Sequence, residues 1–240
     1  MSGKTQLRHD HQEMVLNEVS KKQERLLLSA VKDVEATLRQ QYPNCQFSFK
    51  KKILLNDIVQ HLQHEFADTP FFLCKDTSFM TPDGGILNIV SVTGKEYPIL
   101  ISEKKNQGTN DLRALEGKKR QAQGNAIERL GKNVIGFRAA LLTESIFPFV
   151  CFGDGCDFDE SSSIPDRVRT IAMFGNLNTV YLHNNGPFNR GTFFFRPTVW
   201  SREEMYQHCL DIAERSILYY LSKYGKTHFQ QTPSITSFEG

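Results

Sequence analysis

The chain has 240 residues, of which 39% are hydrophobic and 23% charged, and its net charge at neutral pH is +2. This length and apolar content suit one large domain with a real core. We therefore expect residues 1–240 to form a single domain, with a helical segment over 1–40 and a flexible tail over 226–240. No apolar run approaches the roughly 20 residues of a membrane helix, and the N-terminus has no signal-peptide pattern, so a cytoplasmic protein without membrane contact is expected.

The cysteines and the charges each restrict the possible binding sites. The five cysteines are odd in number and lack CxxC pairing, which favours buried, reduced thiols over a disulfide framework or a zinc site. A net charge of +2 does not establish nucleic-acid binding, because what matters is a local basic patch. Three local clusters exist, although such runs are more often solvated faces: Lys50–Lys52, Lys104–Lys105 and Lys118–Arg120.

Two amphipathic helices are predicted in the first third of the chain. The first has apolar residues at spacings of four and three and ends before Pro43. The second repeats this pattern from Leu55 to Phe66. Short β-rich runs follow at Phe71–Cys74, Ile86–Val92 and Tyr97–Lys105.

The last two of these runs form a predicted hairpin around Thr93–Glu96. Residues Pro98–Ile101 are apolar on both faces, which indicates a central strand covered on both sides. A helix is predicted over Asn125–Leu142 and a buried strand over Phe149–Phe152, so strand, helix and strand follow in order and a parallel crossover is expected. The fold class is therefore α/β.

The remaining predicted elements contain no recognisable catalytic motif. Strands are expected near Thr179–Leu182 and Thr192–Phe195. The final helix is expected to begin at Ser201 and to run to about Leu221, because Ser201 and Glu204 have the spacing of a capping box.

The pattern with the clearest chemical meaning is Pro82-Asp83, a spacer of about twenty residues, and Glu103-Lys104-Lys105. Glu103 and Lys105 are two apart on a strand and share a face, while Lys104 points the other way. The hairpin can bring Asp83 alongside them. Two hard carboxylates favour Mg²⁺, which stabilises charge on a phosphate, and Lys105 can orient the attacking water.

The non-functional interpretation is that the pattern arose by chance, because charged residues are common where strands meet solvent. Its position at the end of an apolar strand favours chemistry, since an idle buried charge pair is costly. His61 and His64 could ligate a metal, but no third ligand is evident. Neither a Walker-type phosphate loop nor a nucleophile elbow is present.

The segment Gly124–Arg129, followed by Lys132-Asn133, closely resembles the recognition helix of the EcoRI family of type II restriction endonucleases. Further segments resemble the family in the same order, and the similarity covers roughly residues 40–160: Tyr42-Pro43, Phe47–Phe49, Pro82–Ile86, Glu103–Gly108, Glu144-Ser145 and Phe147–Val150. Several motifs in one order make coincidence an inadequate explanation.

The resemblance implies a PD-(D/E)xK nuclease with a central mixed β-sheet flanked by helices. By this resemblance Asp83, Glu103 and Lys105 are catalytic, and Asp83 and Glu103 bind Mg²⁺. The family positions that read the adenines of AATT fall on Asn125, Ala126, Glu128 and Arg129. Asparagine suits this role because it can bond adenine N6 and N7 together in the major groove.

After residue 160 the resemblance fades. Where the family has an arginine-bearing segment that helps to read the outermost base pair, this chain has Leu177–Leu182. We therefore expect looser reading of that pair, RAATTY in place of GAATTC, with Gln107, and less surely Arg120 or Arg190, supplying partial preference.

The expected partners are double-stranded DNA, a second copy of the chain and a cognate DNA methyltransferase. A palindrome read by one subunit per half-site requires a twofold axis, and hence a homodimer. Two alternatives stay open at this point: a PD-(D/E)xK nuclease of repair or transposition, which the intact Gly124–Arg129 segment argues against, and a non-catalytic DNA-binding protein, which the retained Asp, Glu and Lys argue against.

Overall fold

The computed structural model describes residues 16–106, 114–115, 117, 124–155, 158, 167 and 191–230, with the backbone alone at 16–20 and 124–129. A five-stranded sheet lies at its centre in the order β1-β4-β5-β6-β7. The strands are β1 (Gln46–Lys50), β4 (Gly85–Val90), β5 (Glu96–Asn106), β6 (Phe149–Asp154) and β7 (Thr192–Arg196).

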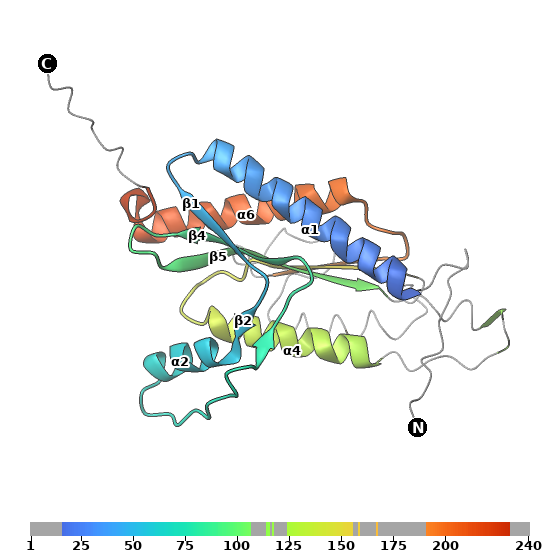
Figure 1. Ribbon diagram of the computed structural model, residues 1–240, viewed down its shortest axis with the longest axis horizontal. Helices are drawn as coiled ribbons and strands as arrows, with labels where there is room; N and C mark the ends of the chain where they lie inside the picture. Colours follow the sequence, from blue (N-terminus) through green and yellow to red (C-terminus); the bar gives the residue numbers. More distant parts are fainter. Residues whose placement is uncertain are drawn as a thin grey trace, which may run out of the picture.

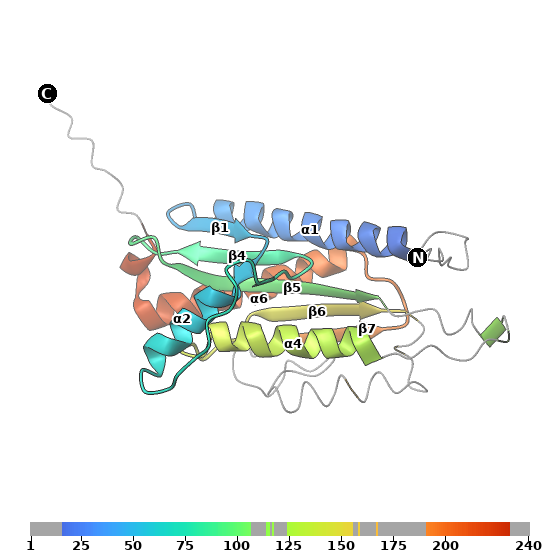
Figure 2. The same ribbon diagram turned by 60° about the horizontal axis from the view of Figure 1, so that its bottom comes forward.

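The sheet is mixed, as the resemblance implied. The β1, β4 and β5 strands are antiparallel neighbours, whereas β5, β6 and β7 run parallel. The expected β4–β5 hairpin, the central position of β5 and the parallel crossover to β6 are all confirmed. Because β5, β6 and β7 are parallel, their carboxyl ends lie at one edge of the sheet, where the arrowheads gather in Figure 2.

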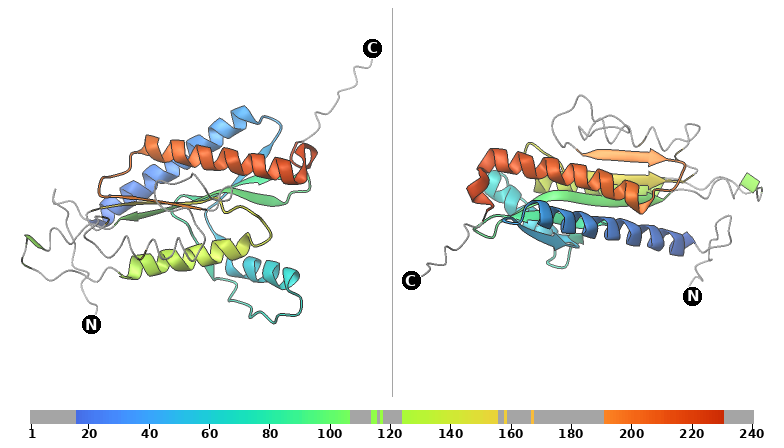
Figure 3. Two further views of the ribbon diagram at one scale, coloured as in Figure 1. Left: turned by 180° about the vertical axis from the view of Figure 1, so that it is seen from behind. Right: turned by 90° about the horizontal axis from the view of Figure 1, so that it is seen from above.

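Helices cover both faces of the sheet (Figures 1 and 3). The long helices α1 (Leu16–Gln41) and α6 (Arg202–Tyr224) pack on one face, and α4 (Gly124–Ala140) with α2 (Leu55–Glu65) lies on the other. Each face has its own apolar core, one rich in α1 and α6 side chains and one built around α4. Burial of alternate strand residues on two faces supplies the main driving force for this three-layer fold.

The capping box predicted at the start of the last helix is confirmed. The Ser201 hydroxyl accepts a hydrogen bond from the Glu204 backbone N–H, and the Glu204 carboxylate accepts one from the Ser201 backbone N–H. The helix continues to Tyr224, and a 3₁₀ turn, η2 (Lys226–His228), follows. Phe229 is 1% exposed, so the packed chain extends to Gln230, past the boundary expected at residue 226.

The strand predicted at Phe71–Cys74 is wrong, because these residues form no regular secondary structure and Phe72 is 95% exposed. Their backbone is instead held by α2 side chains. The Asn56 amide oxygen accepts a hydrogen bond from Cys74 N at 2.7 Å, and Gln63 Oε1 accepts one from Phe71 N at 3.2 Å. A short ladder that was not predicted joins β2 (Ile53–Leu54) to β3 (Phe79–Met80).

Two further expectations concern strands and membranes. The strand expected near Thr179–Leu182 lies outside the described residues. In the part of the chain that the structure describes, no helix has the length and apolar character needed to cross a membrane.

Candidate active site

Asp83, Glu103 and Lys105 meet at the carboxyl end of β5. The Lys105 ammonium forms an ion pair with Glu103 Oε1 and lies 3.3 Å from Asp83 Oδ2. Strand alternation places Glu103 and Lys105 on one face, as predicted from their spacing, and the structure shows that this face is the one toward α4. One cation and two carboxylates therefore share a small volume at the sheet edge.

Asp83 is fixed to β5 by main-chain contacts. Its Oδ2 atom accepts a hydrogen bond from the Lys104 backbone N–H at 3.0 Å. The next residue, Gly84, donates its backbone N–H to Ser102 O at 2.9 Å. Gly85 then turns the chain into β4 with φ at +81°, a conformation that glycine adopts without steric cost. Asp83 is thus held beside Glu103 both by its own side chain and by the backbone of the hairpin.

Burial and neighbouring charges act in opposite directions on the pKa values of this cluster. The Glu103 side chain is 2% exposed, and burial raises its pKa above the ordinary value even though Lys105 beside it acts in the opposite direction. Burial lowers the pKa of Lys105, but Glu103 and Asp83 more than offset this, so its pKa is raised and it stays a cation. Two carboxylates near one ammonium leave net negative charge at the site.

Asn133 is a fourth member of the cluster to which the sequence had given no role. Its side-chain amide, on α4, donates a hydrogen bond to Glu103 Oε1 at 3.1 Å. Oε1 therefore has two donors, Lys105 and Asn133. The sequence contained a partial hint of this role, because Asn133 follows the matched helix motif. It did not show the contact with Glu103, which lies thirty positions earlier in the chain.

Comparisons with known proteins relate the chain to one family. Residues 10–166 match the sequence model of the family described as "Restriction endonuclease EcoRI". The chain belongs to the EcoRI restriction endonuclease family. It is 27% identical over 217 residues to the type II restriction enzyme RsrI of Cereibacter sphaeroides, covering 75% of this chain and 78% of that enzyme. It is 32% identical over 166 residues to the type II restriction enzyme EcoRI of Escherichia coli, covering 65% of this chain and 57% of that enzyme.

Membership of the EcoRI family makes the chain a type II restriction enzyme, a DNA endonuclease, and implies a divalent metal. The residues present fit such a metal. Glu103 Oε2 is buried and has no hydrogen-bond partner among the described residues, an arrangement that is costly unless a cation or water completes it. Among the described residues, no three Asp, Glu, His or Cys side chains lie close enough together to hold a metal ion by themselves. Mg²⁺ needs no more than one or two carboxylates, because waters and phosphate oxygens complete its shell.

Gly84 permits the close approach between Asp83 and β5, and its substitution gives a first prediction. A Cβ atom there would overlap Ser102 Oγ and lie 2.8 Å from Leu27 Cγ. We expect Gly84→Ala to lower the free energy of unfolding by about 1–3 kcal/mol, the usual cost of overpacking. DNA cleavage should fall more than stability alone explains, because Asp83 is displaced. Urea unfolding and single-turnover cleavage well below the unfolding midpoint measure the two effects.

The double variant Gly84→Ala/Ser102→Ala is the matched control. It removes the nearest obstructing atom, Ser102 Oγ, which has no hydrogen-bond partner among the described residues. Both stability and cleavage should recover in part. Equal cleavage rates for wild type and Gly84→Ala would contradict the role given to this close approach.

Four of the residues expected to read DNA lie at the start of α4. Asn125, Ala126, Glu128 and Arg129 belong to the first turns of α4, whose side chains are outside the description up to residue 129. The start of α4 lies beside the carboxyl ends of β5 and β6 (Figure 2). Gln107, Arg120 and Arg190 lie outside the described residues.

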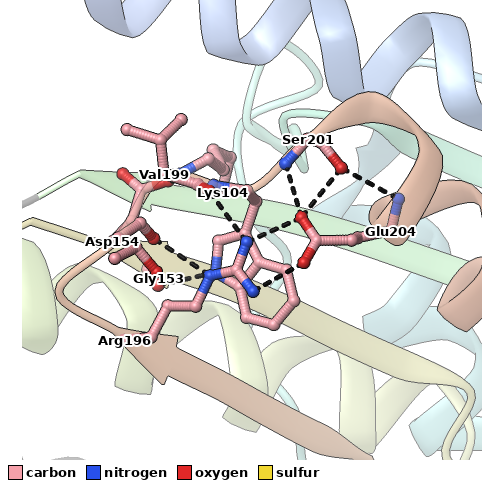
Figure 4. Close-up of polar contacts among 9 residues, drawn as sticks. Lys104, Gly153, Asp154, Arg196, Val199, Ser201 and Glu204 are labelled. Carbon is pink, nitrogen blue, oxygen red and sulfur yellow. Dashed lines mark hydrogen bonds and ion pairs between the residues drawn. The ribbon is translucent and has the colours of Figure 1, made fainter.

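Lys104 faces the opposite side of the sheet, as its position between Glu103 and Lys105 predicted. It is not part of a solvated basic face: its ammonium lies 2.6 Å from Asp154 Oδ2, and both side chains are almost fully buried (Figure 4). Lys104 and Lys105 thus pair with carboxylates on opposite faces of the sheet and do not form a surface patch.

The histidines and cysteines considered in the sequence show no functional arrangement among the described residues. His64 is exposed and lies 3.5 Å from Glu65, and no metal-binding group includes His61 or His64 within the described ranges. Of the cysteines, Cys45, Cys151 and Cys209 are buried free thiols and Cys74 is half-buried, while Cys156 lies outside the description. Burial raises the pKa of Cys151 and Cys209, which keeps these thiols protonated and unreactive.

Proposed function

We propose that this chain is a Mg²⁺-dependent endonuclease that cuts both strands of duplex DNA at a palindrome with an AATT core. Asp83 and Glu103 are the proposed metal ligands, and Lys105 is the proposed catalytic cation. The observation that supports this most is the meeting of these three side chains, together with a buried oxygen of Glu103 that has no hydrogen-bond partner among the described residues. Membership of the EcoRI family supports the same reaction class.

Each side chain has a separate task in this proposal. A divalent cation bound by Asp83 and Glu103 would neutralise charge on the scissile phosphate and lower the pKa of a bound water. Lys105, held as a cation by its two carboxylate neighbours, orients the attacking water and stabilises the developing negative charge. Asn133 occupies Glu103 Oε1 and so leaves Oε2 for the metal.

The proposed recognition surface is the first part of α4, with Asn125, Ala126, Glu128 and Arg129 reading the adenines of AATT. The α4 axis supports this, because the helix begins at the sheet edge that bears Asp83 and Glu103 (Figure 2). Base contacts and the cleaved phosphate could then be reached by one duplex lying across that edge.

Asn125 gives the sharpest test of this surface. We expect Asn125→Ala to weaken binding of AATT-containing DNA by about 1–3 kcal/mol per half-site, the usual value of a bidentate base contact. Binding of a duplex that lacks the site should change little. Gel-shift titration at one fixed salt concentration measures both, since salt alters the phosphate contribution for either DNA. Equal weakening on the two duplexes would contradict a base-reading role.

For the outer base pair we propose relaxed reading, RAATTY, with GAATTC among the preferred sites. The reason is the segment Leu177–Leu182, which contains no arginine, and Gln107 is the residue we expect to supply partial preference. Rates on matched duplexes with GAATTC, AAATTT, CAATTG and TAATTA test this. A rate on GAATTC that exceeds the rate on AAATTT by about a hundredfold, or roughly 2.7 kcal/mol, would contradict it.

The wider arrangement is part of the same proposal. A palindromic site cut on both strands calls for a homodimer with one active site per half-site. A cognate DNA methyltransferase would protect the host's own sites, and the enzyme would act in the cytoplasm, where that DNA lies. Residues 1–240 would form one endonuclease domain.

Digestion of a sequenced plasmid with Mg²⁺ tests the proposal as a whole. Discrete fragments whose ends map to AATT-containing palindromes are expected. A smear would indicate a sequence-tolerant nuclease of repair or transposition, and intact plasmid that is nevertheless bound would indicate a DNA-binding protein without catalysis; either result would overturn the proposal.

A further inference from the structure

A buried ion pair joins the two central parallel strands directly behind the proposed catalytic residues. Lys104 Nζ lies 2.6 Å from Asp154 Oδ2, and the side chains are 2% and 1% exposed. Lys104 stands between Glu103 and Lys105 on β5, and Asp154 is the last residue of β6. The pair therefore ties the catalytic strand to its neighbour at the sheet edge where cleavage is proposed.

The pair is sensitive to the register of the two strands. Lys104 is paired with Phe152 in the ladder, and Asp154 is paired with Asn106, so the lysine reaches forward along the neighbouring strand. A slip of one residue would turn Lys104 to the opposite face and break the contact. The same slip would turn Glu103 and Lys105 away from Asp83.

Asp154 also accepts a hydrogen bond from the segment that leads into α6, on the same face of the sheet as Lys104 (Figure 4). Its Oδ2 atom accepts a hydrogen bond from Trp200 N at 3.1 Å, and the Trp200 indole donates to Gly153 O at 2.8 Å. Arg196 lies 3.7 Å from the centre of the Trp200 ring and makes two 2.7 Å hydrogen bonds to Glu204, in the capping box of α6. The ion pair is thus clamped between β5 and the start of α6.

Stability alone is a poor explanation for this pair. Desolvating two charges costs about as much as their attraction returns, and apolar residues of similar volume are often as stable or more so. Asp154 Oδ1 moreover has no hydrogen-bond partner among the described residues, which adds to the cost. What an apolar pair could not supply is a directional contact that fixes one strand against another.

We propose that Lys104 and Asp154 are positioning residues for DNA cleavage. Their ion pair holds the end of β5 in the register that directs Glu103 and Lys105 toward the scissile phosphate. This inference rests on the proposed function of those two residues. A displacement of about 1 Å in such groups can cost roughly a hundredfold in rate, so a small loosening of β5 has a large effect.

The double variant Lys104→Met/Asp154→Leu tests the proposal, because it removes both charges and fills the buried space with apolar side chains. We expect a thermal midpoint close to that of wild type, unchanged DNA binding in Ca²⁺, and single-turnover cleavage about ten- to a hundredfold slower. The Mg²⁺ concentration for half-maximal rate should rise, which a purely structural role would not cause. Asp154→Asn, which keeps the shape, should show the same two changes if the double variant does not fold.

Two controls separate the possible outcomes. Ile217→Val, in the core between α6 and the sheet, loosens packing away from the ion pair and should cleave like wild type. Glu103→Gln reports on the proposed function itself: if it cuts normally, the site assignment fails, and this inference fails with it. If Glu103→Gln is inactive while folded Lys104→Met/Asp154→Leu matches wild type in rate and Mg²⁺ dependence, the site stands and the positioning role is overturned.

Discussion

Replacing Glu103 by glutamine is expected to slow DNA cleavage by about a thousandfold or more, equivalent to roughly 4 kcal/mol of activation free energy. The amide keeps the volume of the carboxylate but cannot supply the oxygen anion that a divalent cation requires. The fold should survive, because Asn133 and Lys105 still have a hydrogen-bond acceptor in the glutamine oxygen. Single-turnover cleavage of a duplex with one site measures the rate.

The same variant should bind DNA more tightly than wild type when no metal is added. In the proposed complex the scissile phosphate lies close to Glu103 and Asp83, so removing one carboxylate charge should relieve repulsion. Glu96→Gln is the matched control, since Glu96 lies on the same strand at the far end from the site, paired with Lys50. A Glu103→Gln protein that cuts within tenfold of wild type would remove Glu103 from the mechanism.

Replacing Lys105 by methionine is the second large change. Cleavage should fall about a hundredfold to a thousandfold, because the transition state loses a preorganised positive charge. The free energy of unfolding should fall too, by up to about 3–5 kcal/mol, because the buried Glu103 carboxylate loses its cation. In contrast to Glu103→Gln, metal-free DNA binding should weaken.

Lys105→Arg separates charge from shape in this site. Arginine keeps the positive charge, so stability should return toward the wild-type value, but its planar group does not reproduce a compact ammonium and cleavage should stay low. Urea unfolding and single-turnover rates give both readings. Lys105→Met with wild-type cleavage would show that the ammonium is structural and that another group acts on the water.

Much of the fold could be predicted from periodicity and spacing. The β4–β5 hairpin, the central position of β5 and the crossover through α4 follow from the turn signal at Thr93–Glu96, the two apolar faces of β5 and the order strand, helix, strand. The strand at Phe71–Cys74 was wrong because an apolar run alone establishes neither burial nor a partner strand, and Phe72 is in fact 95% exposed. Side chains of α2 satisfy that backbone instead.

The sequence predicted those parts of the site that depend on strand alternation and on the hairpin. Glu103 and Lys105 share a face by alternation, and the hairpin brings Asp83 beside them. Asn133 and Asp154 could not be found in this way, because each reaches β5 from a distant part of the chain. The lack of a hydrogen-bond partner for Glu103 Oε2 among the described residues is likewise a property of packing and not of sequence.

The location of a bound metal tests the central claim most directly. A crystal of the protein with uncleaved site DNA, soaked in Mn²⁺, can be measured for anomalous scattering at the manganese edge. The proposed site predicts a strong peak within coordination distance of carboxylate oxygens from both Asp83 and Glu103, with Lys105 beside the scissile phosphate. A fully occupied manganese peak at the scissile phosphate that touches neither carboxylate would contradict the account.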